Sequence, residues 1–102
     1  MLSDEDARRL LESLSTYDDP ERSVIHHGHG DNCGHCHHLH LYSVVAREIL
    51  ARGEPITEAS IREWDMETTK RWEASKYVRT WREAVERGED PRAVFARLGW
   101  EP

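Results

Sequence analysis

All seven histidines and both cysteines of this 102-residue chain lie between positions 26 and 40. The stretch reads His26-His27-Gly28-His29-Gly30-Asp31-Asn32-Cys33-Gly34-His35-Cys36-His37-His38-Leu39-His40. Imidazole nitrogen and thiolate sulfur are the side-chain donors that zinc prefers. So many of them in one short segment predict a metal-binding loop, and we expect zinc to be the cofactor.

The spacing of the donors favours one ligand set over the others. Cys33 and Cys36 have the Cys-x-x-Cys spacing of a zinc half-site, and two histidines would complete a tetrahedral set. His40 lies four residues after Cys36 and shares its helical face. His29 lies four residues before Cys33, and the glycines of the loop let the backbone close. The predicted ligands are therefore Cys33, Cys36, His40 and His29, and five histidines stand in reserve: His26, His27, His35, His37 and His38.

A structural zinc is favoured over a catalytic one. A catalytic zinc keeps one position open for water and usually has a carboxylate base close by. Asp31 is the only carboxylate inside the histidine-rich stretch, and Glu48 lies two to three helical turns further on. We therefore expect a closed structural site with no catalytic residue. The alternative is a metal-dependent, hydrolase-like enzyme that uses an open His/Cys zinc site with Asp31.

Two shorter motifs leave other chemistries open. Cys33-Gly34-His35-Cys36-His37 resembles the attachment signature of c-type cytochromes, which implies thiols bonded to haem, His37 as axial ligand and Met66 as its partner. Cys33-Gly34-His35-Cys36 also resembles the active-site tetrapeptide of protein disulfide isomerases, which implies dithiol redox activity. That family carries Trp where this chain has Asn32, and its thioredoxin fold needs several strands, of which this sequence predicts almost none.

Helical periodicity dominates the rest of the chain and predicts an all-α fold. Ser3 followed by Asp6 indicates the start of a helix over about Asp4 to Leu14. Its apolar stripe is Ala7, Leu10, Leu11 and Leu14. A second helix is expected from about Cys36 to the stop at Gly53, with one apolar side formed by Leu39, Tyr42, Val45, Ala46, Ile49 and Leu50.

The C-terminal half predicts one long helix and one short helix. Apolar residues at steps of three and four predict a helix over about 57–87, with Ser60 and Glu63 as a capping box. It would be roughly 45 Å long at 1.5 Å per residue, so a kink near 65–69 is expected. Asp90 and Pro91 then start a short helix that ends at Gly99, with Val94, Phe95 and Leu98 turned inward. The expected architecture is one domain (1–102) of three main helices plus a short C-terminal helix, with the zinc loop before the second main helix.

Charge and composition narrow the class of partner. The formal net charge of −6 disfavours nucleic acid, although a nucleic-acid-binding zinc module remains an alternative. The chain opens on acidic residues rather than on a signal segment and has no long apolar stretch, so we expect a cytoplasmic protein without a membrane partner.

Four tryptophans are many for so small a core. Trp64, Trp72 and Trp81 follow the stripe of the long helix, as core residues do. Trp and Arg also anchor interfaces, which makes Trp64, Trp72 and Trp100 the predicted partner-binding residues, in a heteromeric or a homo-oligomeric contact. The sequence thus favours a small zinc-binding interaction or regulatory module, an adaptor or an inhibitor of a protein partner such as phages encode.

Overall fold

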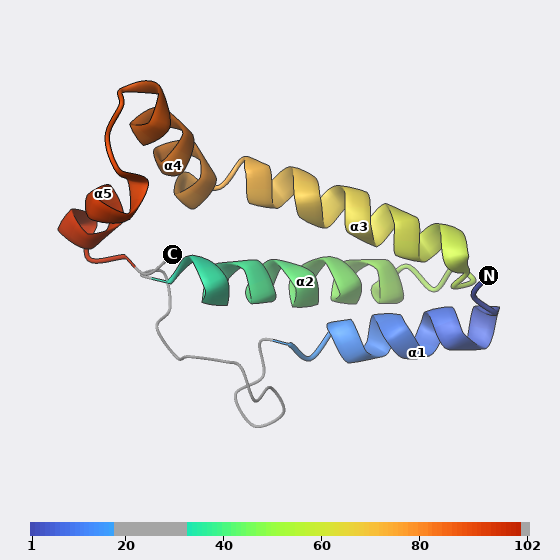
Figure 1. Cartoon of the computed structure of the whole chain (residues 1–102). Helices are drawn as coiled ribbons and strands as arrows, with labels where there is room; N and C mark the ends of the chain where they lie inside the picture. Colours follow the sequence, from blue (N-terminus) through green and yellow to red (C-terminus); the bar gives the residue numbers. More distant parts are fainter. Residues whose placement is uncertain (18–32, 101–102) are drawn as a thin grey trace.

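The structure is a computed structural model, and it describes residues 1–17 and 33–100. Those residues form an all-α fold, as predicted, with five helices. Figure 1 shows them in order along the chain. They are α1 (Asp4–Leu14), α2 (Gly34–Ala51), α3 (Glu58–Glu73), α4 (Lys76–Glu86) and α5 (Pro91–Leu98).

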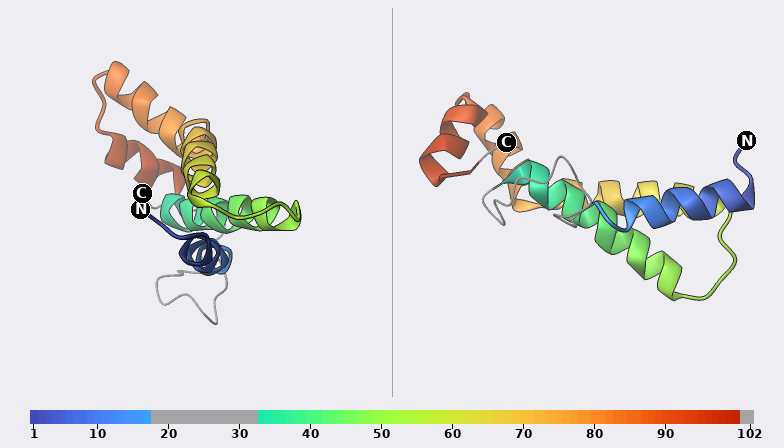
Figure 2. Two further views of the ribbon diagram at one scale, coloured as in Figure 1. Left: turned by 90° about the vertical axis from the view of Figure 1, so that its right-hand side faces the viewer. Right: turned by 90° about the horizontal axis from the view of Figure 1, so that it is seen from below.

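Helices α1, α2 and α3 form the body of the molecule. Helix α2 lies between the other two, with α1 along one side and α3 along the other (Figures 1 and 2). Their facing stripes and the connecting residue Ile56 make one apolar core. The core residues buried there are Ala7, Leu11, Leu14, Val45, Ala46, Ile49 and Ile56. The predicted stripe of α1 is thus confirmed except at Leu10, which is 39% exposed.

Polar contacts fix the ends of α1. The side chain of Ser3 accepts a hydrogen bond from the backbone N–H of Asp6 at 3.1 Å, which is the predicted cap. At the other end, the hydroxyl of Ser43 donates to the carbonyl of Leu14 at 3.1 Å, and Arg47 donates to the carbonyl of Ser15 at 2.9 Å. Because the last carbonyls of a helix have no partner within it, α2 completes α1 by these two bonds.

The predicted helix over 57–87 is two helices, and the expectation of a single element is wrong. Helix α3 ends at Glu73, and α4 starts after Ser75, whose side chain accepts the N–H of Val78 at 3.4 Å. The break therefore lies several residues beyond the kink expected at 65–69. After the break, Tyr77 is 2% exposed and packs against His37 of α2 and against Trp100. The cap of α3 is also different, because Thr57 pairs with Ser60 rather than Ser60 with Glu63.

Helices α4 and α5 form a hairpin at the end of the molecule opposite to the N-terminus (Figure 1). Asp90 caps α5 through the N–H of Arg92 at 3.1 Å, and Gly99 ends it with φ of 74°, both as predicted. Trp100 then folds back onto Tyr77 and Phe95, at centroid distances of 5.2 and 5.5 Å. The hairpin thus has an aromatic core. Leu98, predicted to point inward, is 50% exposed.

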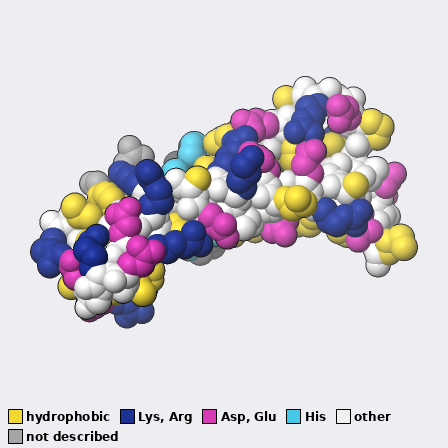
Figure 3. Space-filling model, turned by 90° about the horizontal axis from the view of Figure 1, so that it is seen from above, with side chains coloured by type: hydrophobic (Ala, Val, Ile, Leu, Met, Phe, Trp, Pro, Cys, Tyr) yellow, Lys and Arg dark blue, Asp and Glu magenta, His cyan; other side chains and the backbone are white. Residues whose placement is uncertain are grey.

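On the face seen in Figure 3, charged side chains of both signs alternate with scattered hydrophobic ones. Most of the ion pairs join residues one turn apart on a helix or adjacent elements, such as Arg71 with Glu67 and Glu48. No helix among the described residues has the length and apolar character needed to cross a lipid bilayer.

Candidate metal centre

Cys33 and Cys36 form the start of α2. Cys33 is the N-cap residue, with an extended backbone, and its Sγ accepts a hydrogen bond from the N–H of Cys36 at 3.4 Å. The N–H of His37 donates to the carbonyl of Cys33 at 3.0 Å, which begins the helical hydrogen bonding. The cysteines are 0% and 6% exposed, and no disulfide joins them. The helix start thus holds two thiols on one side of the chain, as a chelating pair requires.

Burial raises the pKa of one thiol of this pair, that of Cys33, above the ordinary value of 9.0. The adjacent Cys36 raises it further, while the N–H of Cys36 acts in the opposite direction. At neutral pH, and with no cation beside it, the Cys33 thiol therefore stays protonated. A bound metal ion would supply the charge that drives deprotonation.

The predicted histidine ligands are distributed unevenly. Among residues 1–17 and 33–100, no three side chains of His, Cys, Asp or Glu come together as a metal-binding group. The structure thus brings Cys33 and Cys36 together, but it adds neither the predicted ligand His40 nor the reserves His35, His37 and His38 to them as a group of three. His40 and His35 are exposed on α2. His29, the reserves His26 and His27, and Asp31 lie outside the described residues.

His37 and His38 are part of an aromatic cluster. The ring of His38 is parallel to that of Trp72, with centroids 4.3 Å apart, and it meets Tyr42 edge-on at 4.7 Å. His37 lies 5.3 Å from the ring of Tyr77 and 6.2 Å from that of Trp72. Burial lowers the pKa of His38, and the nearby His35 and His37 lower it further. These two imidazoles connect the first turns of α2 to α3 and α4, which sequence spacing did not predict.

The three predicted partner-binding tryptophans are half-buried in the structure. Trp64 donates its indole N–H to the carbonyl of Tyr42 at 3.0 Å and packs edge-on against its ring. Trp72 stacks on His38. Trp100 packs in the hairpin core, where the ammonium of Lys76 lies 4.9 Å from its ring centroid. All three therefore have packing roles within the chain.

Trp81 is the tryptophan that the sequence interpretation missed as a surface residue. Its side chain is 36% exposed on α4. Phe95 contacts it edge-on at 5.6 Å, which covers only part of the indole. The apolar stripe assigned Trp81 to the core of one long helix. Val85, one turn further along the same helical face, was assigned to the same stripe and is also exposed, at 58%.

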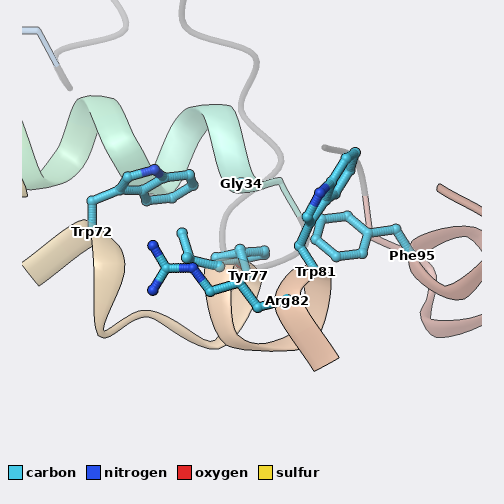
Figure 4. Close-up of a pocket in the computed structure, with 7 residues that line it drawn as sticks. Gly34, Trp72, Tyr77, Trp81, Arg82 and Phe95 are labelled. Carbon is cyan, nitrogen blue, oxygen red and sulfur yellow. The ribbon is translucent and has the colours of Figure 1, made fainter. Parts of the chain in front are cut away.

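An aromatic pocket of about 280 Å³ lies beside Trp81 (Figure 4). Four aromatic rings, one valine and one arginine line it: Trp72, Tyr77, Val78, Trp81, Arg82 and Phe95. Gly34, the residue directly after Cys33, completes the wall. In Figure 4 the guanidinium of Arg82 lies toward the Trp72 end, whereas Trp81 and Phe95 stand at the other end. The start of α2 thus carries the cysteine pair and one edge of this pocket.

No protein-family model, curated protein or solved structure matches the chain.

The geometry of the cysteine pair bears on the redox alternative. Thiols that attack disulfides are accessible and have a lowered pKa. Cys33 is fully buried and its pKa is raised. Both properties disfavour a role like that of the disulfide isomerases. The haem alternative assigned His37 as an axial ligand. In the structure, the imidazole of His37 packs against the rings of Tyr77 and Trp72, which is a structural role.

Proposed function

We propose that this protein is a small interaction module whose N-terminal segment and helical body are held together by one structural zinc ion. The observation that carries the proposal is the pair Cys33 and Cys36, two buried thiols side by side at the start of α2. Tetrahedral zinc needs two further donors. The first candidates are His29 and His40, and His26 and His27 are the nearest substitutes in the sequence. His37 and His38 are weaker candidates because they stack on aromatic rings.

The chemistry of the donors fits zinc. Two thiols and an excess of imidazoles within fifteen positions suit a borderline-soft cation without geometric preference. Bound zinc would supply positive charge next to the buried sulfurs and tie α2 to the segment before it. Thiols that a helix start holds in place lose little conformational entropy when they bind a metal.

A structural role is favoured over a catalytic one by the placement of the carboxylates. The candidate base Glu48 lies on α2 with one carboxylate oxygen 2.7 Å from Arg71, so it serves in an ion pair between α2 and α3. The other candidate, Asp31, lies outside the described residues. A hydrolytic zinc site needs a base close to a metal-bound water. The described residues offer no such base near Cys33 and Cys36.

The metal proposal is tested by elemental analysis of the purified chain and of single variants. Cys33→Ser keeps a good N-cap residue and removes only the thiol, so the helix start is preserved while a ligand is lost. Cys36→Ser, His29→Ala and His40→Ala test the other members of the set, and His35→Ala tests an exposed reserve histidine that lies between the two cysteines.

The expected result is one zinc per wild-type chain, with loss of zinc in both cysteine variants and retention in His35→Ala. Retention of stoichiometric zinc in both cysteine variants would contradict the proposal. Loss in the cysteine variants alone would leave the zinc site standing and overturn the choice of His29 and His40.

A further inference from the structure

The aromatic pocket contains one charged group that has no partner. Arg82 lines the pocket, and no acidic side chain among the described residues forms an ion pair with it. The other arginines of the hairpin include Arg87 and Arg97, which both bind Glu89. Within residues 1–17 and 33–100, the guanidinium of Arg82 thus has no acidic partner, and it lies next to an apolar cavity.

Positive and negative charges are distributed unevenly along the chain, and the hairpin region carries the positive excess. Residues 74–102 carry six Lys or Arg and five Asp or Glu, whereas residues 1–73 carry eight and fifteen. The part of the sequence that forms the hairpin is thus slightly basic in an otherwise acidic protein. An acidic group that approaches this chain is repelled by the body and attracted to the hairpin.

We propose that the pocket binds a bulky apolar side chain from an acidic segment of a protein partner, with a carboxylate of that segment paired to Arg82. The aromatic walls take the apolar side chain, and the planar guanidinium takes the carboxylate. This inference rests on the proposed role as an interaction module and names the surface and the chemistry of its partner.

The size and surroundings of the pocket favour a peptide segment over a free small molecule. Its volume of about 280 Å³ is below the roughly 300–1,000 Å³ of cavities that enclose drug-sized ligands. Val85, one helical turn after Trp81, is 58% exposed and extends the apolar surface along α4. One large side chain would fill the cavity, and its neighbours in the segment would cover Trp81 and Val85. Aromatic residues and Arg are also the usual anchors of protein interfaces.

The test uses the zinc-loaded full chain and the indole N–H signals of its four tryptophans in a nitrogen-15 NMR spectrum. Each signal is assigned by a Trp→Phe substitution. The probe is the capped peptide Glu-Glu-Phe-Glu-Glu, compared with Gln-Gln-Phe-Gln-Gln, which lacks the charge, and with Glu-Glu-Ala-Glu-Glu, which lacks the ring. Arg82→Gln removes the proposed partner of the carboxylate. Arg62→Gln makes the same change of charge on the exposed surface of α3 and is the control.

The acidic Phe peptide should shift the signals of Trp81 and Trp72 and leave that of Trp64, which is hydrogen-bonded to Tyr42, unchanged. Arg82→Gln should weaken binding about tenfold, the scale of one charge-assisted hydrogen bond, and Arg62→Gln should not. Added salt should weaken binding as well.

Three results would overturn the inference. The first is equal binding of the acidic and neutral Phe peptides. The second is the absence of shifts with any peptide at millimolar concentration in a folded chain. The third is a shift of the Trp81 signal with protein concentration alone, which would make a second copy of the chain the occupant. Metal content is measured on the same samples, so a chain that holds zinc and binds no peptide contradicts this inference only.

Discussion

The imidazole ring of His38 lies parallel to the indole of Trp72, with 2° between the ring planes and 4.3 Å between the centroids. The contact joins the first half of α2 to the end of α3, where the chain turns into α4. Tyr42 contacts the same imidazole edge-on, with centroids 4.7 Å apart. His38, one histidine of the histidine-rich stretch, thus contributes to the packing of the domain.

Replacement of His38 should therefore destabilise the fold. We expect His38→Ala to lower the free energy of unfolding by about 1–2 kcal/mol, because it removes two aromatic contacts and leaves space against Trp72. His35→Ala, at an exposed position of the same helix, should change it by less than about 0.5 kcal/mol. Urea unfolding followed by tryptophan fluorescence measures both. Equal effects of the two variants would show that the stacking contributes nothing, and loss of zinc from His38→Ala would make His38 a ligand.

Removal of the metal should lower the thermal stability of the chain without abolishing its helices. A ligand that binds only the folded state stabilises it by about 4 kcal/mol at a thousandfold excess over its Kd. The core formed by Leu11, Val45 and Ile49 does not include the cysteines, so α1, α2 and α3 should stay helical in part. Circular dichroism melts before and after chelation provide the measurement. An unchanged melting temperature after confirmed loss of zinc would argue against a structural metal.

The core of the body can be tested with two neighbouring leucines. Leu11 is fully buried among the residues of α2, whereas Leu10 is 39% exposed. Leu11→Ala should cost about 2–4 kcal/mol of unfolding free energy, because it leaves a cavity, and Leu10→Ala should cost less than about 1 kcal/mol. Chemical denaturation measures the difference. A larger effect at Leu10 would mean that α1 packs through another face.

Acid should weaken the link between α4 and α5. Glu89 accepts hydrogen bonds from Arg87 at 2.8 Å and from Arg97 at 2.9 Å, and these lower its pKa below the ordinary value of 4.5. The unfolded chain then takes up a proton at Glu89 at a higher pH than the folded chain does. The stabilisation is therefore complete above about pH 4.5 and is lost as the pH falls through the lowered pKa.

The measurement is the melting temperature of wild type and of Glu89→Gln between pH 7 and pH 3. The difference between them should be largest at neutral pH and should shrink as the pH falls below 4.5. A constant difference across the range would mean that the charge of Glu89 plays no part.

The sequence predicted helix ends well where a capping residue determines where the helix starts or stops. Ser3 before an acidic turn, and Asp90 and Pro91 before a short apolar stripe ended by Gly99, predicted α1 and α5 with their caps. These signals work because capping and turn formation depend on the few nearest residues.

The features that sequence reasoning missed depend on tertiary contacts. The stripe from Ile61 to Val85 continues across Ser75, so periodicity alone does not show that α3 ends there. Tyr77, two residues after Ser75, is buried against Trp100, a tertiary contact that periodicity does not reveal. Spacing likewise does not show that His38 packs against Trp72 and Tyr42, because both contacts depend on how the helices meet. The exposure of Trp81 was missed for the same reason, because α4 is a separate helix and not a continuation of α3.

Gly34 follows the candidate ligand Cys33 directly in the chain and is itself part of the wall of the aromatic pocket. An ion that ordered the first turn of α2 would also order this edge of the pocket. Thermodynamic reciprocity then applies: if the ion strengthens the hold on a guest by some factor, the guest strengthens the hold on the ion by the same factor. The concentrations of the metal ion and of the bound partner segment would thus each change the affinity of the protein for the other.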